Sequence, residues 1–296
     1  MKMINLIKNE KMQNIAYKVT SFLPDELFIK LKFKRHMGYW PNLKNPVTYN
    51  EKLQWMKLNY HNPEEAILVD KHYVRKYVSN VVGSQILIPE IGVWKRAEDI
   101  DFNTLPSQFV LKCTHDSGSV IICKDKSKLD IEATKKWLTK RLNASGGEYG
   151  REWNYSQVEP QIIAEKYMEE IDDQVKDYKF FCFDGEPVLM FVGSDRFTGI
   201  KFDFFDLEFN HLDIVNGHPQ NKKNIPEKPA NFDKMLDIVR KLSKGLPHVR
   251  VDLYNLNGAI YFGELTFNHF SGFTPFEPSN WDYYLGEKFI LPNCMK

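Results

Sequence analysis

The stretch that decides the fold reads His-Val-Arg-Val-Asp-Leu-Tyr-Asn-Leu-Asn-Gly-Ala-Ile-Tyr-Phe-Gly-Glu-Leu-Thr over residues 248–266. Apolar and polar side chains alternate on both sides of Gly258, which is typical of two antiparallel strands joined by a tight turn. Because successive side chains of a strand point to opposite faces, one face of this hairpin is predicted to be core. The residues on that face are Val249, Val251, Leu253, Leu265 and Phe267.

The other face of the predicted hairpin gathers charged side chains. A three-residue loop at Leu256–Gly258 would place Arg250 opposite Glu264 and Asp252 opposite Phe262, with all four on one side of the sheet. Two carboxylates beside a guanidinium suit a site where a hard cation meets phosphate oxygens. The same pattern also fits an Arg–Glu ion pair on a wet surface, and the hairpin alone does not decide between the two.

Length and composition predict a globular protein with more than one lobe. The chain has 296 residues, of which 43% are hydrophobic and 14% aromatic, enough for several packed cores. A formal net charge of +1 predicts no general affinity for nucleic acid. No apolar run is long enough for a signal peptide or a membrane span. The four cysteines lack metal-ligand spacing and are typical of reduced thiols, so we expect a cytoplasmic protein.

The segment 30–36 combines lysine, arginine and aromatic side chains. It is compatible with peripheral contact with an anionic membrane surface or with polysaccharide machinery. A solvated helix face is the more common explanation for such a run, so the segment alone assigns no partner. The sequence also leaves the oligomeric state open.

Helix signals fill the first part of the chain. The first sixty residues carry helical patterns, and Thr48 or Asn50 is placed to cap a helix there. Asn62 followed by Pro63 predicts another helix start, since proline suits the first helical position. Asp70 is a candidate cap for the helix after that.

From about residue 108 the pattern changes to short strands. Strands are predicted at 108–113, 119–124, 161–168, 178–183 and 187–193. Asp130 and Asn231 are predicted to cap the helices that lie between strands. This succession indicates α+β lobes rather than a parallel βαβ run.

A lysine and a glycine-bearing turn follow each other in the first strand pair. Lys112 lies near the end of its strand, and the turn after it reads Asp116-Ser117-Gly118-Ser119. Backbone N–H groups of such a turn can approach phosphate oxygens, and a lysine adds a point charge. Most such turns only reverse the chain, and the residue order of a Walker A loop is absent. We expect residues 114–119 and 143–151 to close over phosphates and exclude water.

Five segments together make the chain resemble the ATP-grasp superfamily, typified by D-alanine–D-alanine ligase and glutathione synthetase. They cover about residues 70–270, and their order and spacing are more specific than any one of them. Lys71 and Lys112 match the lysines that bind ATP phosphates, Glu165 lies in the strand that reads adenine, and Asp177 matches the ribose-binding acid. The resemblance implies ATP contacts by Lys71, Lys112, Ser117, Gly118, Ser119, Glu165, Lys166, Met168 and Asp177.

The same resemblance implies that Asp252 and Glu264 bind Mg²⁺ and that Arg250 is the catalytic residue that holds the transferred phosphate. One position departs from the family pattern. The family usually carries Asn two residues after the metal-binding Glu, whereas here Thr266 occupies that place and Asn268 follows it. These two residues are the candidates for the third metal contact.

The whole chain is similar to a branch of this superfamily named after the teichuronopeptide biosynthesis protein TupA. In that branch Thr266 would be an ordinary residue rather than a lesion. The segments that carry this similarity are 45–53, 177–180, 263–267 and 271–273.

The resemblance implies an α+β ATP-grasp fold, in which two α+β lobes grip a nucleotide behind a helical N-terminal region. The corresponding division is 1–60 for the helical region, 61–105 for the N-terminal part of the nucleotide-binding core, 106–168 for the small lobe with its phosphate loop, and 169–296 for the C-terminal lobe with the metal site.

It also implies an ATP- and Mg²⁺-dependent carboxylate–amine ligase that works through an acyl phosphate. The branch is linked to surface polysaccharides, which implies a uronic-acid carboxylate as one substrate and an amino acid or small amine as the other. Two other functions stay open. A glycosyltransferase would bind a nucleotide sugar and consume no ATP, and an ATP-dependent sugar phosphotransferase would need no amine.

Overall fold

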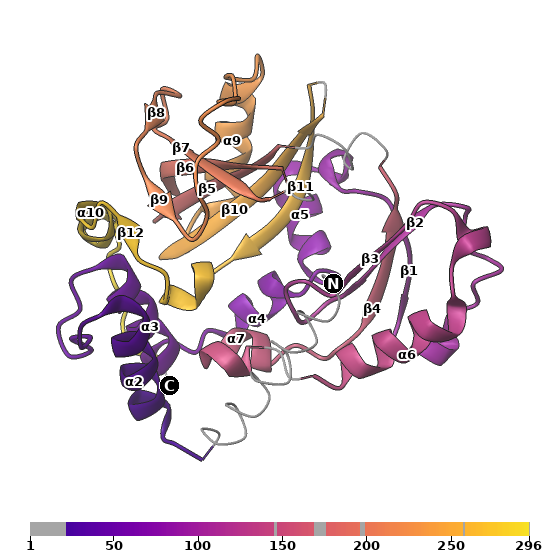
Figure 1. The fold of residues 1–296 in the computed structure, drawn as a ribbon, viewed down its shortest axis with the longest axis horizontal. Helices are drawn as coiled ribbons and strands as arrows, with labels where there is room; N and C mark the ends of the chain where they lie inside the picture. The colour runs from indigo at the N-terminus through magenta and orange to yellow at the C-terminus, as the bar shows by residue number, and fades with distance from the viewer. Residues whose placement is uncertain (1–21, 145–146, 169–175, 196–198, 257, 296) are drawn as a thin grey trace.

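The computed structural model describes residues 22–144, 147–168, 176–195, 199–256 and 258–295. It contains two large antiparallel sheets with helices packed around them, and these form two lobes (Figure 1). The α+β architecture predicted from the sequence is therefore confirmed.

The smaller lobe is a four-stranded antiparallel sheet in the order β1-β4-β2-β3. Its strands are β1 (Glu90–Trp94), β2 (Phe109–Cys113), β3 (Val120–Cys123) and β4 (Ile162–Lys166). Helix α6 (Ile131–Leu142) packs beside β2, and Leu138 joins Phe109 and Leu111 in a buried core. Because side chains alternate along β2, Lys112 points to the other face of this sheet.

The larger lobe is a six-stranded antiparallel sheet in the order β11-β10-β5-β6-β7-β8. Its strands are β5 (Asp177–Phe183), β6 (Glu186–Ser194), β7 (Lys201–Phe205), β8 (His211–Leu212), β10 (His248–Leu256) and β11 (Ala259–Thr266). Helices α5 (Val74–Val82) and α9 (Phe232–Ser243) cover one face, where Phe180 and Val251 belong to the largest core. Both faces of this sheet are buried over much of its area.

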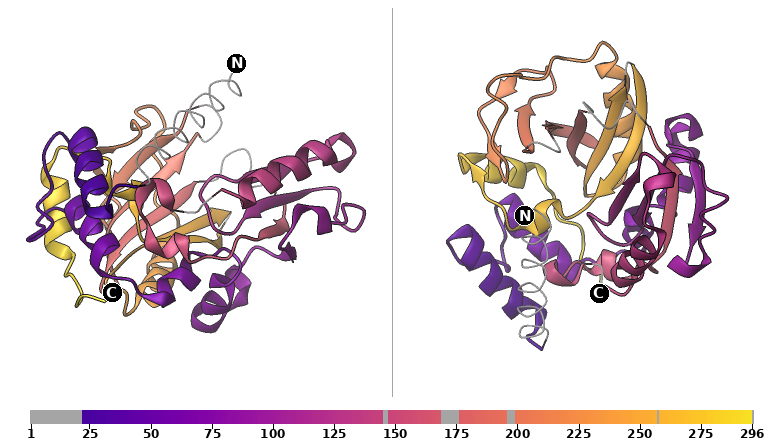
Figure 2. Two further views of the ribbon diagram at one scale, coloured as in Figure 1. Left: turned by 90° about the horizontal axis from the view of Figure 1, so that it is seen from below. Right: turned by 45° about the vertical axis from the view of Figure 1, so that its right-hand side comes forward.

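Helices α2 (Asp25–Met37), α3 (Tyr49–Asn59) and α10 (Asn280–Lys288) lie together at the end of the molecule away from α6 (Figures 1 and 2). Tyr49 and Leu53 of α3 share a core with Phe181 and Phe191 of the large sheet. The N-terminal region is thus packed against the C-terminal lobe, while the four-part division of the chain stays a prediction. The remaining elements are α4 (Pro63–Val69), α7 (Trp153–Ser156), β9 (Val215–Asn216), β12 (Phe276–Glu277) and the short 3-10 helices Ser84–Ile86, Ala97–Asp99, Lys126–Lys128, Glu148–Gly150 and His269–Gly272.

Capping explains where several helices begin. Thr48 and Glu51 form a reciprocal capping box at α3, and Asn62 and Asp130 cap α4 and α6 through their side chains. The prediction for Asn231 is wrong in its chemistry, because its side chain makes no capping bond to α9. It donates to the carbonyl of Gly258 and accepts from Asn255, so it joins the start of α9 to the β10–β11 turn.

The predicted register of the β10–β11 hairpin is also wrong. Leu256 pairs with Ala259, so the connection is one residue shorter than the predicted loop, and Gly258 has a left-handed φ of 88°. The register then shifts at a bulge beside Gly263, where an added Cβ would lie 3.0 Å from the carbonyl oxygen of Asp252. As a result Asp252 faces Glu264 directly. Arg250 faces Thr266, and Phe262 pairs with Leu253 on the core side.

Two other predictions from the sequence, the closing segment 143–151 and the lack of a membrane span, can be compared with only part of the chain. The stretch 143–151 includes residues 145–146, which lie outside the described residues. Within the described part of the chain, no helix combines the length and the apolar composition needed to cross a bilayer.

Candidate nucleotide and metal site

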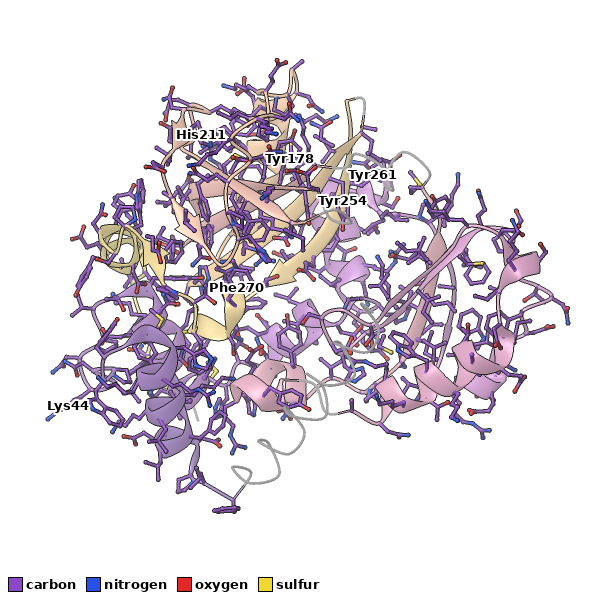
Figure 3. The ribbon with its side chains drawn as sticks, viewed as in Figure 1. Lys44, Tyr178, His211, Tyr254, Tyr261 and Phe270 are labelled. Atoms are coloured by element: carbon purple, nitrogen blue, oxygen red, sulfur yellow. The ribbon has the colours of Figure 1, made fainter. Side chains whose placement is uncertain are left out.

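A cavity of about 330 Å³ lies between the two sheets, within the usual size range of ligand pockets. Tyr254 lines it from the β10–β11 hairpin, and Figure 3 labels this residue and Tyr261 on that hairpin. Part of the wall is apolar and suits a planar base. The apolar residues of this wall include Ile88, Val110, Ile122, Met168 and Phe262.

Most of the predicted site residues meet in this one cavity. Those that line it are Lys71, Lys112, Ser117, Gly118, Glu165, Lys166, Met168, Asp177, Asp252 and Glu264. Four others do not line it, namely Ser119, Arg250, Thr266 and Asn268. The residues come from both sheets and from the start of the segment that leads into α5, so the fold and not the sequence distance brings them together.

On the small-lobe wall, Glu165 of β4 binds two cationic side chains. Its Oε2 lies 2.5 Å from Lys112 Nζ, and its Oε1 lies 3.2 Å from Arg75 Nη1. Burial lowers the pKa of Lys112, but the charge and hydrogen bond of Glu165, together with Tyr254 and Glu264, outweigh burial, and the pKa is raised overall. Lys112 is therefore cationic at neutral pH and can bind an anion. Arg75 was missed in the sequence, although it follows Lys71 by one helical turn.

The glycine-bearing turn is held by contacts behind its tip. Arg141 of α6 donates from Nη2 to Asp116 Oδ2 at 2.6 Å and from Nε to Ser119 Oγ at 2.6 Å. Lys71 Nζ donates to the backbone carbonyl of Asp116. Ser119 is thus buried and stabilises the loop through its hydrogen bond to Arg141. Gly118 has a φ of 102°, and among the described residues no atom beyond its chain neighbours lies within 4 Å of the position that a Cβ would take. The loop presents Ser117 and Gly118 to the cavity and the side chains of Asp116 and Ser119 to α6.

On the large-lobe wall, Asp252 lies at the centre of a buried charge network. Arg250 donates from Nε to Asp252 Oδ1 at 2.7 Å and from Nη2 to Oδ2 at 2.7 Å, which is a bidentate pair. Lys179 on the neighbouring strand β5 faces Asp252 and bonds to Oδ2, and it also lies 2.9 Å from Asp177 Oδ2. Sequence reasoning missed Lys179, although it lies two residues after Asp177, a spacing that puts both side chains on one face of a strand.

Glu264 completes this network toward the cavity. Its side chain is 39% exposed, and Oε1 lies 3.2 Å from Arg250 Nη2. Burial would raise the pKa of Glu264, but Lys179, Arg250 and Lys71 together lower the pKa to about 2. The carboxylate is therefore ionised across the physiological range.

A family model described as TupA-like ATPgrasp matches residues 51–290, about four fifths of the chain. The protein belongs to the TupA-like ATP-grasp family. The resemblance inferred from the sequence is confirmed, and the fold is that of the ATP-grasp ligases. A comparison with curated protein sequences finds no match to this chain.

Solved structures of ATP-grasp ligases are also similar to this chain. The D-alanine–D-alanine ligase of Bacillus anthracis, solved with ATP, matches with a TM-score of 0.39 and 18% identity over 68% of this chain and 53% of that one. The Helicobacter pylori enzyme matches with a TM-score of 0.40 and 14% identity over 76% and 62%. Phosphoribosylamine–glycine ligase of Thermotoga maritima matches with a TM-score of 0.40 and 13% identity over 69% and 48%. The chain thus spans less than two thirds of the length of each of these ligases.

The donor atoms of this TupA-like protein fit Mg²⁺ shared with phosphates. Asp252 and Glu264 are directly opposed on β10 and β11. Asp252 Oδ1 accepts from Arg250 Nε, whereas Oδ2 accepts from both Arg250 Nη2 and Lys179 Nζ. No three His, Cys, Asp or Glu side chains that could hold a metal come together in the described ranges. Mg²⁺ commonly uses one or two carboxylates and completes its shell with phosphate and water, so this pair suits that ion.

The two candidates for the third metal contact have other partners in this structure. Thr266 Oγ1 lies 3.2 Å from Glu264 Oε1 and 3.0 Å from Arg250 Nη2, so the hydroxyl joins the charge network. Asn268 instead donates to Asn154 Oδ1 at 3.3 Å. Thr266 therefore lies closer than Asn268 to the carboxylates of Asp252 and Glu264 that are the candidate metal ligands.

A buried histidine, His269, accepts a hydrogen bond from the guanidinium nitrogen of Arg250 that does not bind Asp252. Arg250 Nη1 lies 2.6 Å from His269 Nδ1, and His269 Nε2 lies 2.8 Å from Asn216 Oδ1. Because a guanidinium only donates, Nδ1 must accept and Nε2 carries the proton. Burial, with the charges of Arg250 and Lys179, lowers the pKa of His269 well below its ordinary value. This neutral histidine therefore positions Arg250 and is not an acid–base group.

Proposed function

We propose that this protein is an ATP- and Mg²⁺-dependent carboxylate–amine ligase. A carboxylate oxygen of the first substrate attacks the γ-phosphorus of ATP, ADP leaves, and an acyl phosphate forms. The nitrogen of the amine then attacks the acyl carbon and loses a proton. Phosphate departs with the original carboxylate oxygen, and an amide remains. No covalent bond to the protein is needed, so its contribution is positioning and charge neutralisation.

One observation carries this proposal. Lys112 lies on the small-lobe wall of the cavity, and Lys71 and Arg75 contact that wall from the segment that leads into α5. The opposed carboxylates Asp252 and Glu264 lie on the large-lobe wall. Phosphates bound to the first wall would meet a metal bound to the second. A nucleoside triphosphate with Mg²⁺ would supply the matching charges, because Mg²⁺ held by Asp252 and Glu264 would neutralise negative charge on the phosphate oxygens.

Each residue has a stated role in the proposal. Lys71 and Lys112 hold the phosphates after exchanging their present partners, Asp116 and Glu165, for phosphate oxygens. Asp252 and Glu264 would hold the metal. Arg250 orients Asp252 through its bidentate pair and is proposed to hold the acyl phosphate with Nη1, one N–H of which bonds to His269.

The proposed acceptor is a uronic-acid carboxylate, and the proposed amine is an amino acid or small amine. This substrate pair rests on the likeness to the TupA branch and its link with surface polysaccharides. On the same ground we propose a role in polysaccharide biosynthesis.

Oxygen transfer tests the reaction directly. We would incubate the protein with ATP, Mg²⁺, uronic acids labelled with ¹⁸O in the carboxylate and a panel of amines, and then analyse the products by mass spectrometry. A ligase transfers one ¹⁸O to the released phosphate and forms an amide, and its ADP release rises when both substrates are present. Phosphate that stays on a hydroxyl without oxygen transfer would identify a sugar phosphotransferase. Stabilisation by a nucleotide sugar but not by ATP would identify a glycosyltransferase.

A further inference from the structure

Helix α2 turns a mixed apolar and basic stripe away from the protein. Ile29 and Phe33 are its buried residues, one turn apart on the inner side. At 100° per residue, the direction opposite to them is occupied by Leu27, Leu31 and the adjacent pair 34–35. Leu27 is 45% exposed and Leu31 is 46% exposed. An ordinary surface helix places polar residues along that line, so two leucines at its centre are unusual.

Further exposed apolar side chains flank this stripe at both ends of the helix. Phe22 precedes it with 76% of its surface exposed, and Trp40 follows it with 57% exposed. Lys44 lies at the outer edge of the same end of the molecule (Figure 3). Tryptophan and aliphatic residues next to lysine and arginine are characteristic of segments that lie in a membrane interface.

The positive charge of the chain is concentrated in the N-terminal part that contains α2. Residues 1–44 contain nine Lys and Arg and three Asp and Glu, which gives +6. The remaining residues contain 31 basic and 36 acidic side chains, which gives −5. The net charge of +1 therefore conceals a basic N-terminal part and an acidic remainder. An anionic surface would attract the first and repel the second, which orients the protein.

We propose that the outer face of α2, with Leu27, Leu31, Lys34 and Arg35 at its centre, docks on an anionic lipid bilayer. The leucines would enter the boundary between headgroups and acyl chains, while the basic side chains contact lipid phosphates. A lipid surface fits better than an acidic polysaccharide, because a hydrated polymer offers nothing to cover aliphatic side chains. This inference does not depend on the reaction proposed above, since none of these residues lines the cavity between the sheets.

Vesicle co-sedimentation of the full chain tests the proposal. We expect binding to phosphatidylglycerol-containing vesicles, little binding to phosphatidylcholine vesicles, and weakening as salt rises. Lys34→Gln with Arg35→Gln should weaken binding about thirtyfold, since each basic residue near such a surface contributes about five- to sixfold. Leu27→Ser with Leu31→Ser should weaken binding at every salt concentration. Lys222→Gln with Lys223→Gln is the matched control, because it removes two exposed charges elsewhere.

Thermal unfolding and ATP turnover with water-soluble substrates should be unchanged in all three variants. Equal binding to neutral vesicles would overturn the proposal, as would an equal loss in the control. So would binding to a polyuronate polymer in place of vesicles. If residues 1–21 or a second copy of the chain cover the stripe, the α2 variants will not alter vesicle binding, and that result also refutes docking by this face.

Discussion

The two walls of the cavity hold their charges in different ways. On the large-lobe wall, the buried Asp252 binds the buried Arg250 on its own strand and the partly buried Lys179 on the neighbouring strand. On the small-lobe wall, Lys112 binds a carboxylate that a phosphate could replace, and Lys71 binds a loop carbonyl. The large-lobe wall is thus organised before any ligand arrives, which is what electrostatic stabilisation of a reaction requires. On the small-lobe wall, the lysines must exchange their present partners for phosphate oxygens when a nucleotide binds.

Asp252→Asn should produce the largest effect, because it breaks the pre-organised wall at its centre. The variant leaves Arg250 and Lys179 without their shared carboxylate. Removing one partner of a buried ion pair costs about 3–5 kcal/mol of stability, and we expect turnover to fall by roughly a hundredfold or more. Chemical denaturation and steady-state ADP release measure the two losses. Asp184→Asn, an exposed turn residue in the same sheet, is the control and should change neither. Near-normal activity in Asp252→Asn would remove this residue from the site.

Glu264→Gln separates the metal role from the structural role. Turnover should again fall by roughly a hundredfold, since the carboxylate is a proposed metal ligand, but stability should fall less because the side chain is 39% exposed. The folded-state pKa of about 2 lies below the reference value of 4.5. The ionised group therefore stabilises the fold above pH 4.5, and this contribution is lost as the pH falls from 4.5 to 2.

Thermal melts across that pH window check this assignment. The difference in melting temperature between wild type and Glu264→Gln should be full at pH 6 and should disappear near pH 2. A difference that stays constant down to pH 2 would show that the neighbouring cations do not depress the pKa of Glu264.

Lys112→Gln tests the small-lobe wall and should lower stability and ATP binding less than the two substitutions above lower stability and turnover. Glu165 keeps its contact with Arg75 in this variant, so the free protein should melt within a few degrees of wild type. The ATP-dependent rise in melting temperature should shrink, because a charge-assisted contact of about 1.5–3 kcal/mol to phosphate is lost, roughly ten- to hundredfold in affinity. Lys136→Gln on the exposed side of α6 is the control. An unchanged ATP effect would mean that Lys112 serves only to hold Glu165.

The sequence predicted which residues meet at the cavity better than it predicted how they pair. Alternation along the hairpin placed Arg250, Asp252 and Glu264 on one side, as observed, because strand periodicity is a local property. The pairing was wrong by two residues at Arg250, which faces Thr266. Two local facts caused this, the shorter turn and the bulge beside Gly263. Both depend on backbone packing. A glycine in the sequence is compatible with a tight turn or with a bulge, and it does not by itself predict which of the two forms.

The contacts that the sequence missed are long-range. Lys179 reaches Asp252 across 73 residues of chain, and Arg75 reaches Glu165 across 90. Each residue could be assigned to a predicted element, but its partner depends on strand order, which the spacing of motifs does not give. His269 illustrates the same limit, since only the tertiary fold brings Arg250 and Asn216 to its two ring nitrogens.

The smallest expected effect concerns the loop 114–119, which belongs to the small-lobe wall. Arg141→Gln removes the bonds from Arg141 to Asp116 and Ser119 and leaves Lys71 in place. We expect a broad-specificity protease to cleave within 114–119 about three- to tenfold faster in the variant, since local opening then breaks fewer bonds. Mass spectrometry of the fragments locates the cut. An ATP analogue with Mg²⁺ should protect both proteins, because closure over phosphates restores order by new contacts. Cleavage at equal rates with and without the analogue would mean that this loop does not close over the nucleotide, and the contrast between the two walls would then rest on Lys112 alone.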